Sequence, residues 1–312
     1  MSTIFRDIVT LADGVNFWTL NDSNVRYGSP GAVIRCDLLD GWEDSAEPIV
    51  EVSTFGYSDG VSAEDRFPLK EQYYLVGGYV VATTRAEADE CREVISRMFA
   101  HNRLIRLVRQ GPIAKAVEVR RVSKIEFPAD SNVETGFRWI VTLMAPWPYK
   151  FGIDLKTGWA GAYAGGDIFR TYSGPDTAPY RTYTGPTTAP YRVYTDPSSV
   201  SAIPLSVNAV NGGTADAYPI LDVIGPLPGR SWQLINEATS EMLTFELDLA
   251  AGQALRIDSR NKQAWIGEEP VDYYVRGDWI RLIPGSNTLR LLATSDSTSA
   301  LVQVQFYDTF TR

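Results

Sequence analysis

LeuValGlnValGlnPhe at 301–306 has the pattern that decides the fold of the second half of this chain. Its apolar residues alternate with two glutamines, so one face of the run is apolar and the other polar, as in a half-buried β-strand. Seven other short runs rich in β-branched and aromatic residues precede it: ValIleGly at 223–225, SerTrpGlnLeuIleAsn at 231–236, LeuThrPheGluLeu at 243–247, AlaLeuArgIleAsp at 254–258, GlnAlaTrpIleGly at 263–267, TrpIleArgLeu at 279–282 and ThrLeuArgLeuLeu at 288–292. Turn residues separate them at the spacing of a sandwich or barrel. We therefore predict an antiparallel β-sandwich over residues 204–312.

Residues 1–150 are predicted to form a β-rich domain with one helix. Asp13-Gly14 lies between two strand-like runs and indicates a hairpin. Thr84 and Glu87 have the spacing of a capping box, which satisfies the free amides at a helix start. Five apolar residues then fall on one helical face: Ala88, Cys91, Ile95, Met98 and Phe99. The predicted helix covers residues 85–101, and the fold class is mainly β.

A change of composition separates the two predicted domains at residues 151–203. Pro146 and Pro148 end the preceding strand because neither has an amide to donate. A Gly-rich stretch follows, and then an 11-residue repeat over 169–201 in which each unit keeps aromatic-Arg-x-Tyr-(Ser/Thr)-x-Pro. Such a unit is too short to bury its own core. The repeat is interpreted either as a semi-rigid linker or as an arm that docks on a neighbouring subunit or a sheet edge. In the second case the contacts come from Arg170, Tyr172, Tyr180, Arg181, Tyr183, Tyr191, Arg192 and Tyr194.

Composition and charge exclude several functional classes. The 312 residues carry a net charge of −9, which argues against a nucleic-acid binder but is compatible with a wall past which DNA slides. The two cysteines, Cys36 and Cys91, form neither a disulfide framework nor a zinc motif. We see no signal peptide and no membrane-spanning run, so we expect synthesis in a cytoplasm.

The sequence offers little catalytic chemistry, and we predict no enzyme, metal or cofactor. His101 is the one histidine. Ser58 lies in a Gly-x-Ser-x-Gly pattern, but no helix pattern follows it, so a Ser-Asp-Gly turn explains the match. The acidic residues between Asp37 and Glu47 fit no calcium loop. Trp265, Tyr273 and Trp279 are candidates for a sugar-stacking platform, although core or intersubunit packing is the commoner role of such rings.

Several motifs occur in the order found in one known family. Val207-Asn208 with Gly212-Gly213-Thr214-Ala215 resembles the Asn-x-Gly-Thr start of the C-terminal domain of phage distal tail proteins. The same family then has an Ile-x-Gly strand, a Gly-x-x-Leu-x-Ile-Asp segment and a Pro-Gly-x-Asn turn. Their counterparts here are Val223-Ile224-Gly225, Gly252 to Asp258, and Pro284-Gly285-Ser286-Asn287. The N-terminal half is similar too, from a single helix after a Gly-rich strand to the closing Ala145–Tyr149 segment.

This resemblance implies a structural virion protein at the tail tip of a long-tailed, siphovirus-like bacteriophage. Members of the family form a ring, usually a homohexamer, that connects the tail tube protein to the baseplate hub and lets DNA pass without specific binding. Their C-terminal domains are often galectin-like sandwiches. The alternative is a carbohydrate-binding module for host-surface glycans. Because the galectin sugar site uses a histidine and His101 lies outside the sandwich, the resemblance does not carry over lectin activity.

Overall fold

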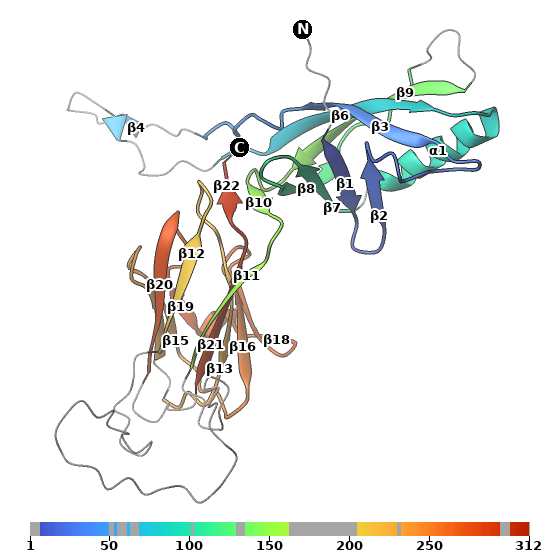
Figure 1. The fold of residues 1–312 in the computed structure, drawn as a ribbon. Coiled ribbons are helices and arrows are strands. Elements are labelled where there is room, and N and C mark those ends of the chain that lie inside the picture. The colour runs from blue at the N-terminus through green and yellow to red at the C-terminus, as the bar shows by residue number, and fades with distance from the viewer. Residues whose placement is uncertain are drawn as a thin grey trace, which may run out of the picture. The chain divides into compact units, whose positions relative to one another are not determined.

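The computed structural model describes residues 7–49, 53–54, 61–62, 69–100, 103–128, 135–161, 205–229, 232–293 and 300–311 (Figure 1). The chain divides into two compact units. The first comprises Met1–Leu155, Asn211–Ala217 and Tyr307–Arg312, and the second comprises Lys156–Val210 and Tyr218–Phe306. Both units are built on antiparallel sheets, which confirms the predicted mainly β fold class.

The first unit is built on a nine-stranded sheet. Seven strands form its main path, in the order β2 (Phe17–Leu20), β1 (Ile8–Ala12), β7 (Ile105–Gln110), β8 (Lys115–Arg121), β9 (Gly136–Ala145), β6 (Gln72–Val81) and β3 (Val33–Asp40). Beside this path, β10 (Lys150–Gly152) pairs with β8 and with β22 (Thr309–Phe310). A separate pair joins β4 (Ser53–Thr54) to β5 (Val61–Ser62).

Asn21 links the two end strands of this path. It follows β2 and has a φ of 67°, a conformation that Asn adopts more readily than most residues. Its backbone amide donates to the Ile34 carbonyl at 3.2 Å, and its side chain bonds both backbone groups of Cys36, which lies with Ile34 on β3. The sheet is thereby joined across its ends, so its edges are not left open.

The helix α1 (Arg85–Met98) packs its apolar face into the core of the first unit. The N-cap half of the predicted capping box is confirmed, since Glu87 N donates to Thr84 Oγ1 at 3.2 Å. The Glu87 carboxylate accepts instead from the backbone amide of Thr83, one residue before the N-cap, at 2.6 Å. The helix ends before the predicted residue 101, because Phe99 leaves helical geometry and packs its ring 5.6 Å from that of Trp139. His101 lies outside the described residues. No helix in the described ranges combines the length and apolarity that a membrane span requires.

Gly78 allows β6 to approach β3 closely at a bulge. A Cβ atom at this position would lie 1.8 Å from the Arg35 carbonyl oxygen, and the register of the two strands shifts between Cys36 and Leu38. Only glycine permits such an approach without moving the backbone. The Gly77-Gly78 pair therefore has a structural explanation.

The second unit contains two antiparallel sheets (Figure 1). The six-stranded sheet has the order β11 (Lys156–Gly161), β21 (Leu301–Phe306), β13 (Ile220–Ile224), β16 (Ala254–Asp258), β17 (Gln263–Ile266) and β18 (Glu269–Pro270). The five-stranded sheet has the order β12 (Leu205–Asn211), β20 (Gly285–Leu292), β14 (Trp232–Asn236), β15 (Glu241–Phe245) and β19 (Val275–Gly277). The short 3-10 turn η2 (Asp272–Tyr274) precedes β19.

The core of this sandwich follows the alternation of its strands. Along β21, Val302, Val304 and Phe306 are buried while the residues between them are partly exposed, as the 301–306 pattern predicts. Trp232 stacks on Phe245 with ring centroids 4.0 Å apart, and its indole N–H donates to the Leu247 carbonyl at 2.9 Å. The polar atom of this large side chain is thus satisfied inside the core.

The first unit is completed by two segments from much later in the chain. Thr214 N and Ala215 N both donate to the Thr309 carbonyl at 2.9 Å, and β22 adds to β10. A Cβ atom on Gly213 would lie 1.9 Å from that same carbonyl oxygen, so glycine is required there. Both segments belong to the predicted sandwich of 204–312, and residues 156–161 to the predicted linker. In the structure the second unit instead begins with β11 at Lys156.

Candidate functional site

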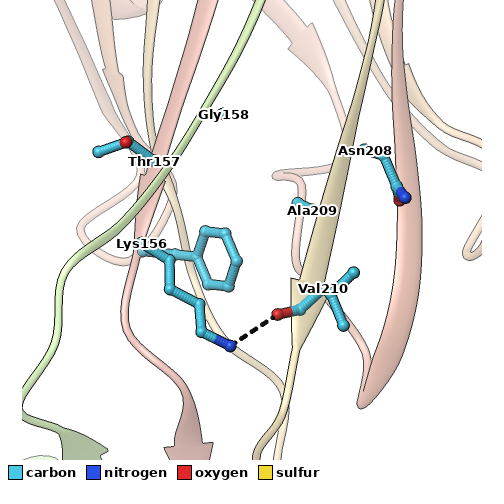
Figure 2. A pocket seen from close by; sticks show the side chains of 7 residues that line it. Lys156, Thr157, Gly158, Asn208, Ala209 and Val210 are labelled. Carbon is cyan, nitrogen blue, oxygen red and sulfur yellow. Dashed lines mark hydrogen bonds between the residues drawn. The ribbon is translucent and has the colours of Figure 1, made fainter.

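A concave site in the described part of the second unit lies where edge strands of its two sheets run side by side. The edge strands there are β11 of one sheet and β12 of the other. Between them lies a pocket of about 410 Å³ (Figure 2). We call this feature the edge groove; it is lined by Lys156, Thr157, Gly158, Asn208, Ala209, Val210 and Phe306.

Lys156 bridges the edge groove at one end. Its ammonium group donates to the Val210 carbonyl at 3.0 Å, a contact visible in Figure 2, and lies 6.0 Å from the centroid of the Phe306 ring. The charge of Lys156 is thus turned toward the groove, and a backbone carbonyl of β12 accepts a hydrogen bond from it. The other wall carries the carboxamide of Asn208, which bonds Ser286 Oγ at 2.9 Å.

The two groove strands run in opposite directions. Lys156 lies opposite Val210, while a Cβ atom on Gly158 would lie 2.8 Å from a Val207 methyl carbon. Along the groove, residue numbers fall on β12 while they rise on β11. The end of β11 at Gly161 and the start of β12 at Leu205 therefore lie at the same end of the groove. Glycine at 158 also allows the walls to approach, since a side chain there would meet Val207 and Val304.

The Pro284-Gly285-Ser286-Asn287 turn holds β20 next to β12. Asn287 is fully buried, and its amide donates to the carbonyls of Ile283 and Gly285 at 2.8 and 3.1 Å. Its side-chain oxygen accepts from Ile283 N at 3.0 Å and from the Asn236 amide at 3.1 Å. The side chain of Asn287 therefore supplies hydrogen-bond partners to backbone groups of the turn.

The groove suits binding better than catalysis. Its polar groups are one ammonium, one carboxamide, one hydroxyl and strand backbone, so it lacks a paired nucleophile and base. Among the residues that the structure describes, no group of three His, Cys, Asp or Glu side chains could hold a metal ion.

The three residues of the predicted sugar platform lie on β17, in η2 and shortly after β19. Tyr273 is 58% exposed and its ring centroid lies 4.2 Å from that of Tyr274 in η2. Trp265 is partly exposed on β17. Trp279 follows β19 beside the start of β15, where Asp278 N bonds the Met242 carbonyl. Tyr273 and Tyr274 are thus two exposed rings that lie in contact with each other.

Other residues singled out in the sequence have different outcomes. Ser58 and the whole 169–201 repeat lie outside the described residues. Three of the five acidic residues of 37–47 pair with separate cations: Glu47 with Lys70, Asp37 with Arg138 and Glu43 with Arg109.

Sequence reasoning missed a fully buried lysine in the first unit. The ammonium of Lys150 lies 5.6 and 5.8 Å from the ring centroids of Trp42 and Tyr74 and 3.4 Å from the Asp44 carbonyl. Desolvation by burial, with the nearby charge of Lys115, lowers the pKa of Lys150 from 10.5 to about 8. The sequence before Lys150 contains two prolines and two aromatic residues at 146–149. This pattern does not predict that the lysine ammonium is buried.

Comparison with known proteins points to one family. Residues 212–310 match the family model described as "Siphovirus-type tail component, C-terminal domain". No curated protein matches the chain in sequence. The match, which spans the Gly-Gly-Thr, Ile-x-Gly and Pro-Gly-x-Asn motifs, confirms the resemblance to distal tail proteins.

A solved structure shares the fold over nearly the whole chain. The crystal structure of Dit (gp 19.1) of phage SPP1, described as a paradigm of hub adsorption apparatus in phages that infect Gram-positive bacteria, has a TM-score of 0.58 at 13% identity, covering 97% of this chain and 99% of that one. Chains of the phage P2 baseplate in its activated conformation, with Ca and with Sr, have TM-scores of 0.45 at 10% identity and cover 96% of this chain and 97% of theirs.

Proposed function

We propose that this chain is a structural protein of the tail tip of a long-tailed phage, because residues 212–310 match the family model for the C-terminal domain of siphovirus-type tail components. The family match is the observation that carries the proposal, and the fold shared with SPP1 Dit supports it. The protein acts by binding other tail components and not by catalysis. Its place is the virion, after synthesis in the host cytoplasm.

In this role the protein assembles as a closed ring, a homohexamer by family resemblance, between the tail tube protein and the hub. The first unit forms the ring. DNA passes through without specific contacts, and the net charge of −9 suits a wall that repels phosphate. Closed homo-oligomers of this kind use the same pair of surfaces at each contact.

The ring is tested by light scattering of the purified protein with negative-stain images of the same fraction. We expect a mass of about six chains and annular particles. The measurement is repeated after mixing with the tail tube and hub proteins, since tail rings can need partners to close. A monomer under all of these conditions, together with absence of the chain from purified tails, contradicts the proposed function.

The 169–201 repeat is proposed to be an arm that contacts a neighbouring copy. Its aromatic and Arg residues are Arg170, Tyr172, Tyr180, Arg181, Tyr183, Tyr191, Arg192 and Tyr194. A plain spacer has no need for so many rings. Replacing 169–201 with a Gly-Ser linker is expected to weaken the oligomer while both units keep their unfolding transitions. Unchanged oligomer stability would return the repeat to the role of linker.

A second candidate function is binding of host-surface glycans by the sandwich. The paired exposed rings of Tyr273 and Tyr274 favour it, because sugars stack on accessible aromatic faces. A glycan array tests it with Tyr273→Ala, Trp265→Ala and Trp279→Ala. Tyr79→Ala is the matched control, since Tyr79 is also exposed but lies in the first unit. Binding that survives all three sandwich substitutions, or no binding by the parent protein, excludes this platform.

A further inference from the structure

The two sides of the sandwich differ in how their edges are protected against pairing. On one side the edge strands are short: β18 has two residues, including Pro270, and β19 has three, including Arg276 and Gly277. Short length, proline and charge are the usual protections of a sheet edge. The other side has β11 with six residues and β12 with seven, and its one charge is that of Lys156.

In the part of the chain that the structure describes, this second side also exposes apolar surface. Trp159 on β11 is 54% exposed and Val210 on β12 is 50% exposed. The edge groove between the strands adds an open volume of about 410 Å³ with the Phe306 ring in its lining. A long edge with a single charge beside a groove is an arrangement by which proteins accept an added strand: backbone bonds give affinity and side-chain pockets give selectivity.

One segment of the chain is suited to this edge. Residues 162–204 connect Gly161 at the end of β11 to Leu205 at the start of β12, at one end of the groove. The segment contains three five-residue runs of the form aromatic-Arg-x-Tyr-(Ser/Thr), at 169–173, 180–184 and 191–195. β11 is six residues long, so one run matches it in length. An edge accepts one strand, and each copy carries three runs, so runs are available for the edges of other copies.

The side-chain pattern of a run fits the two faces of the edge. In an extended run, alternate residues point to opposite faces. Tyr180, Thr182 and Thr184 would share one face, and Arg181 and Tyr183 the other. On β11, Lys156 and Gly158 are partly buried on the groove face, while the exposed side chain of Trp159 faces outward. The ring and hydroxyls of the run would fill the groove beside Asn208, and the guanidinium would stack on the exposed indole of Trp159.

We propose that the β11 edge and its groove receive one run of the 169–201 repeat from a neighbouring copy of this chain, by addition of a β-strand. The proposal rests on the proposed function of the repeat as an arm and names the surface that receives it. It predicts a direct contact between β11 of one copy and the repeat of another.

Disulfide trapping between two copies tests this contact. One tagged copy carries Trp159→Cys and an untagged copy carries Arg181→Cys, with Arg170→Cys and Arg192→Cys as alternatives for the other runs. The natural thiols do not interfere, because Cys36 and Cys91 are buried, and burial raises their pKa to about 12 and about 11. After mixing and oxidation, at least one pair is expected to form a covalent tagged–untagged dimer. Glu269→Cys on the β18 edge replaces Trp159→Cys as the control and is expected to form none.

The possible results separate this proposal from the ring. If rings form but Trp159→Cys gives no disulfide between copies, the proposed contact of β11 with the repeat is wrong, and the proposed ring still stands. If the disulfide between copies forms but no ring is seen, the contact of β11 with the repeat is supported, and the result counts against the proposed ring. If the double variant Trp159→Cys/Arg181→Cys closes only an internal disulfide, and no pair links two copies, the repeat covers its own edge and the proposal is wrong. Equal linking from Glu269→Cys also overturns it.

Discussion

The side chain of Asn21 pairs with the backbone of Cys36 as a strand residue would. Cys36 N donates to Asn21 Oδ1 at 2.8 Å, and Asn21 Nδ2 donates to the Cys36 carbonyl, also at 2.8 Å. A third bond runs from Asn21 Nδ2 to the Asp7 carbonyl at 2.8 Å. One amide thus joins β1, β2 and β3 where the main sheet would otherwise end in open edges.

Asn21→Ala is expected to destabilise the first unit by about 1–3 kcal/mol, because it leaves buried backbone groups unpaired and places alanine at positive φ. The midpoint of urea unfolding measures this loss. Asn24→Ala is the matched control, since Asn24 is exposed and its backbone amide makes its bond to Asp22. An Asn21→Ala midpoint equal to that of the control would show that the link is dispensable.

Gly213→Ala is expected to displace the segment around β22. The added methyl group would lie 1.9 Å from the Thr309 carbonyl oxygen, which accepts two backbone bonds. The cost of such overpacking is roughly 1–3 kcal/mol. Hydrogen exchange should show faster exchange at Thr309 and Thr311. Gly111→Ala serves as control, because its nearest neighbour would lie 3.7 Å away. Unaltered protection of Thr309 in Gly213→Ala would contradict the expectation.

Asn287→Ala is expected to cost the sandwich roughly 2–4 kcal/mol, because a fully buried network loses its central donor and acceptor. Asn236 would lose a partner as well. Ser286→Ala removes one exposed bond to Asn208 from the same turn and should change stability by far less. Calorimetry compares the two variants through the unfolding transition of the second unit. Equal losses of stability for the two substitutions would argue against the network.

Burial of the Lys150 ammonium leads us to expect that the free energy of unfolding rises with pH. Its pKa is about 8 in the folded state and 10.5 when solvated, so the unfolded chain binds more protons between these values. The folded state therefore gains stability as pH rises from about 8 to about 10.5, and below that window the contribution is constant. Lys150→Met should remove a gain of roughly 1–3 kcal/mol.

This pH dependence is measured as the difference between parent and variant, because tyrosines and other lysines also titrate in the window. Lys124→Met provides the matched control, since the side chain of Lys124 is 80% exposed. Parallel stability curves for the parent and Lys150→Met from pH 8 to 10.5 would show that the Lys150 ammonium is not desolvated as the structure indicates.

Local patterns predicted much of the fold. The alternation at 301–306 and the N-cap half of the Thr84–Glu87 capping box both depend on neighbours in the sequence, and both were found as expected. β11 was missed because Gly158 and Gly161 weaken its strand pattern, and the reason for Gly158 lies in Val207, far along the chain. The edge groove could not be predicted for the same reason: its walls come from residues 156–158, 208–210 and 306. Likewise, burial of Lys150 depends on Trp42 and Tyr74, with which it shares no local pattern.

The position of β22 sets the order in which the chain can be completed during synthesis. The second unit ends at Phe306, whereas the first still lacks Tyr307–Arg312 when Phe306 has been added. The unit that a ribosome begins first is therefore the last to be finished. A nascent chain interrupted after Phe306 would carry a whole sandwich and a first unit whose β10 has no β22 to pair with.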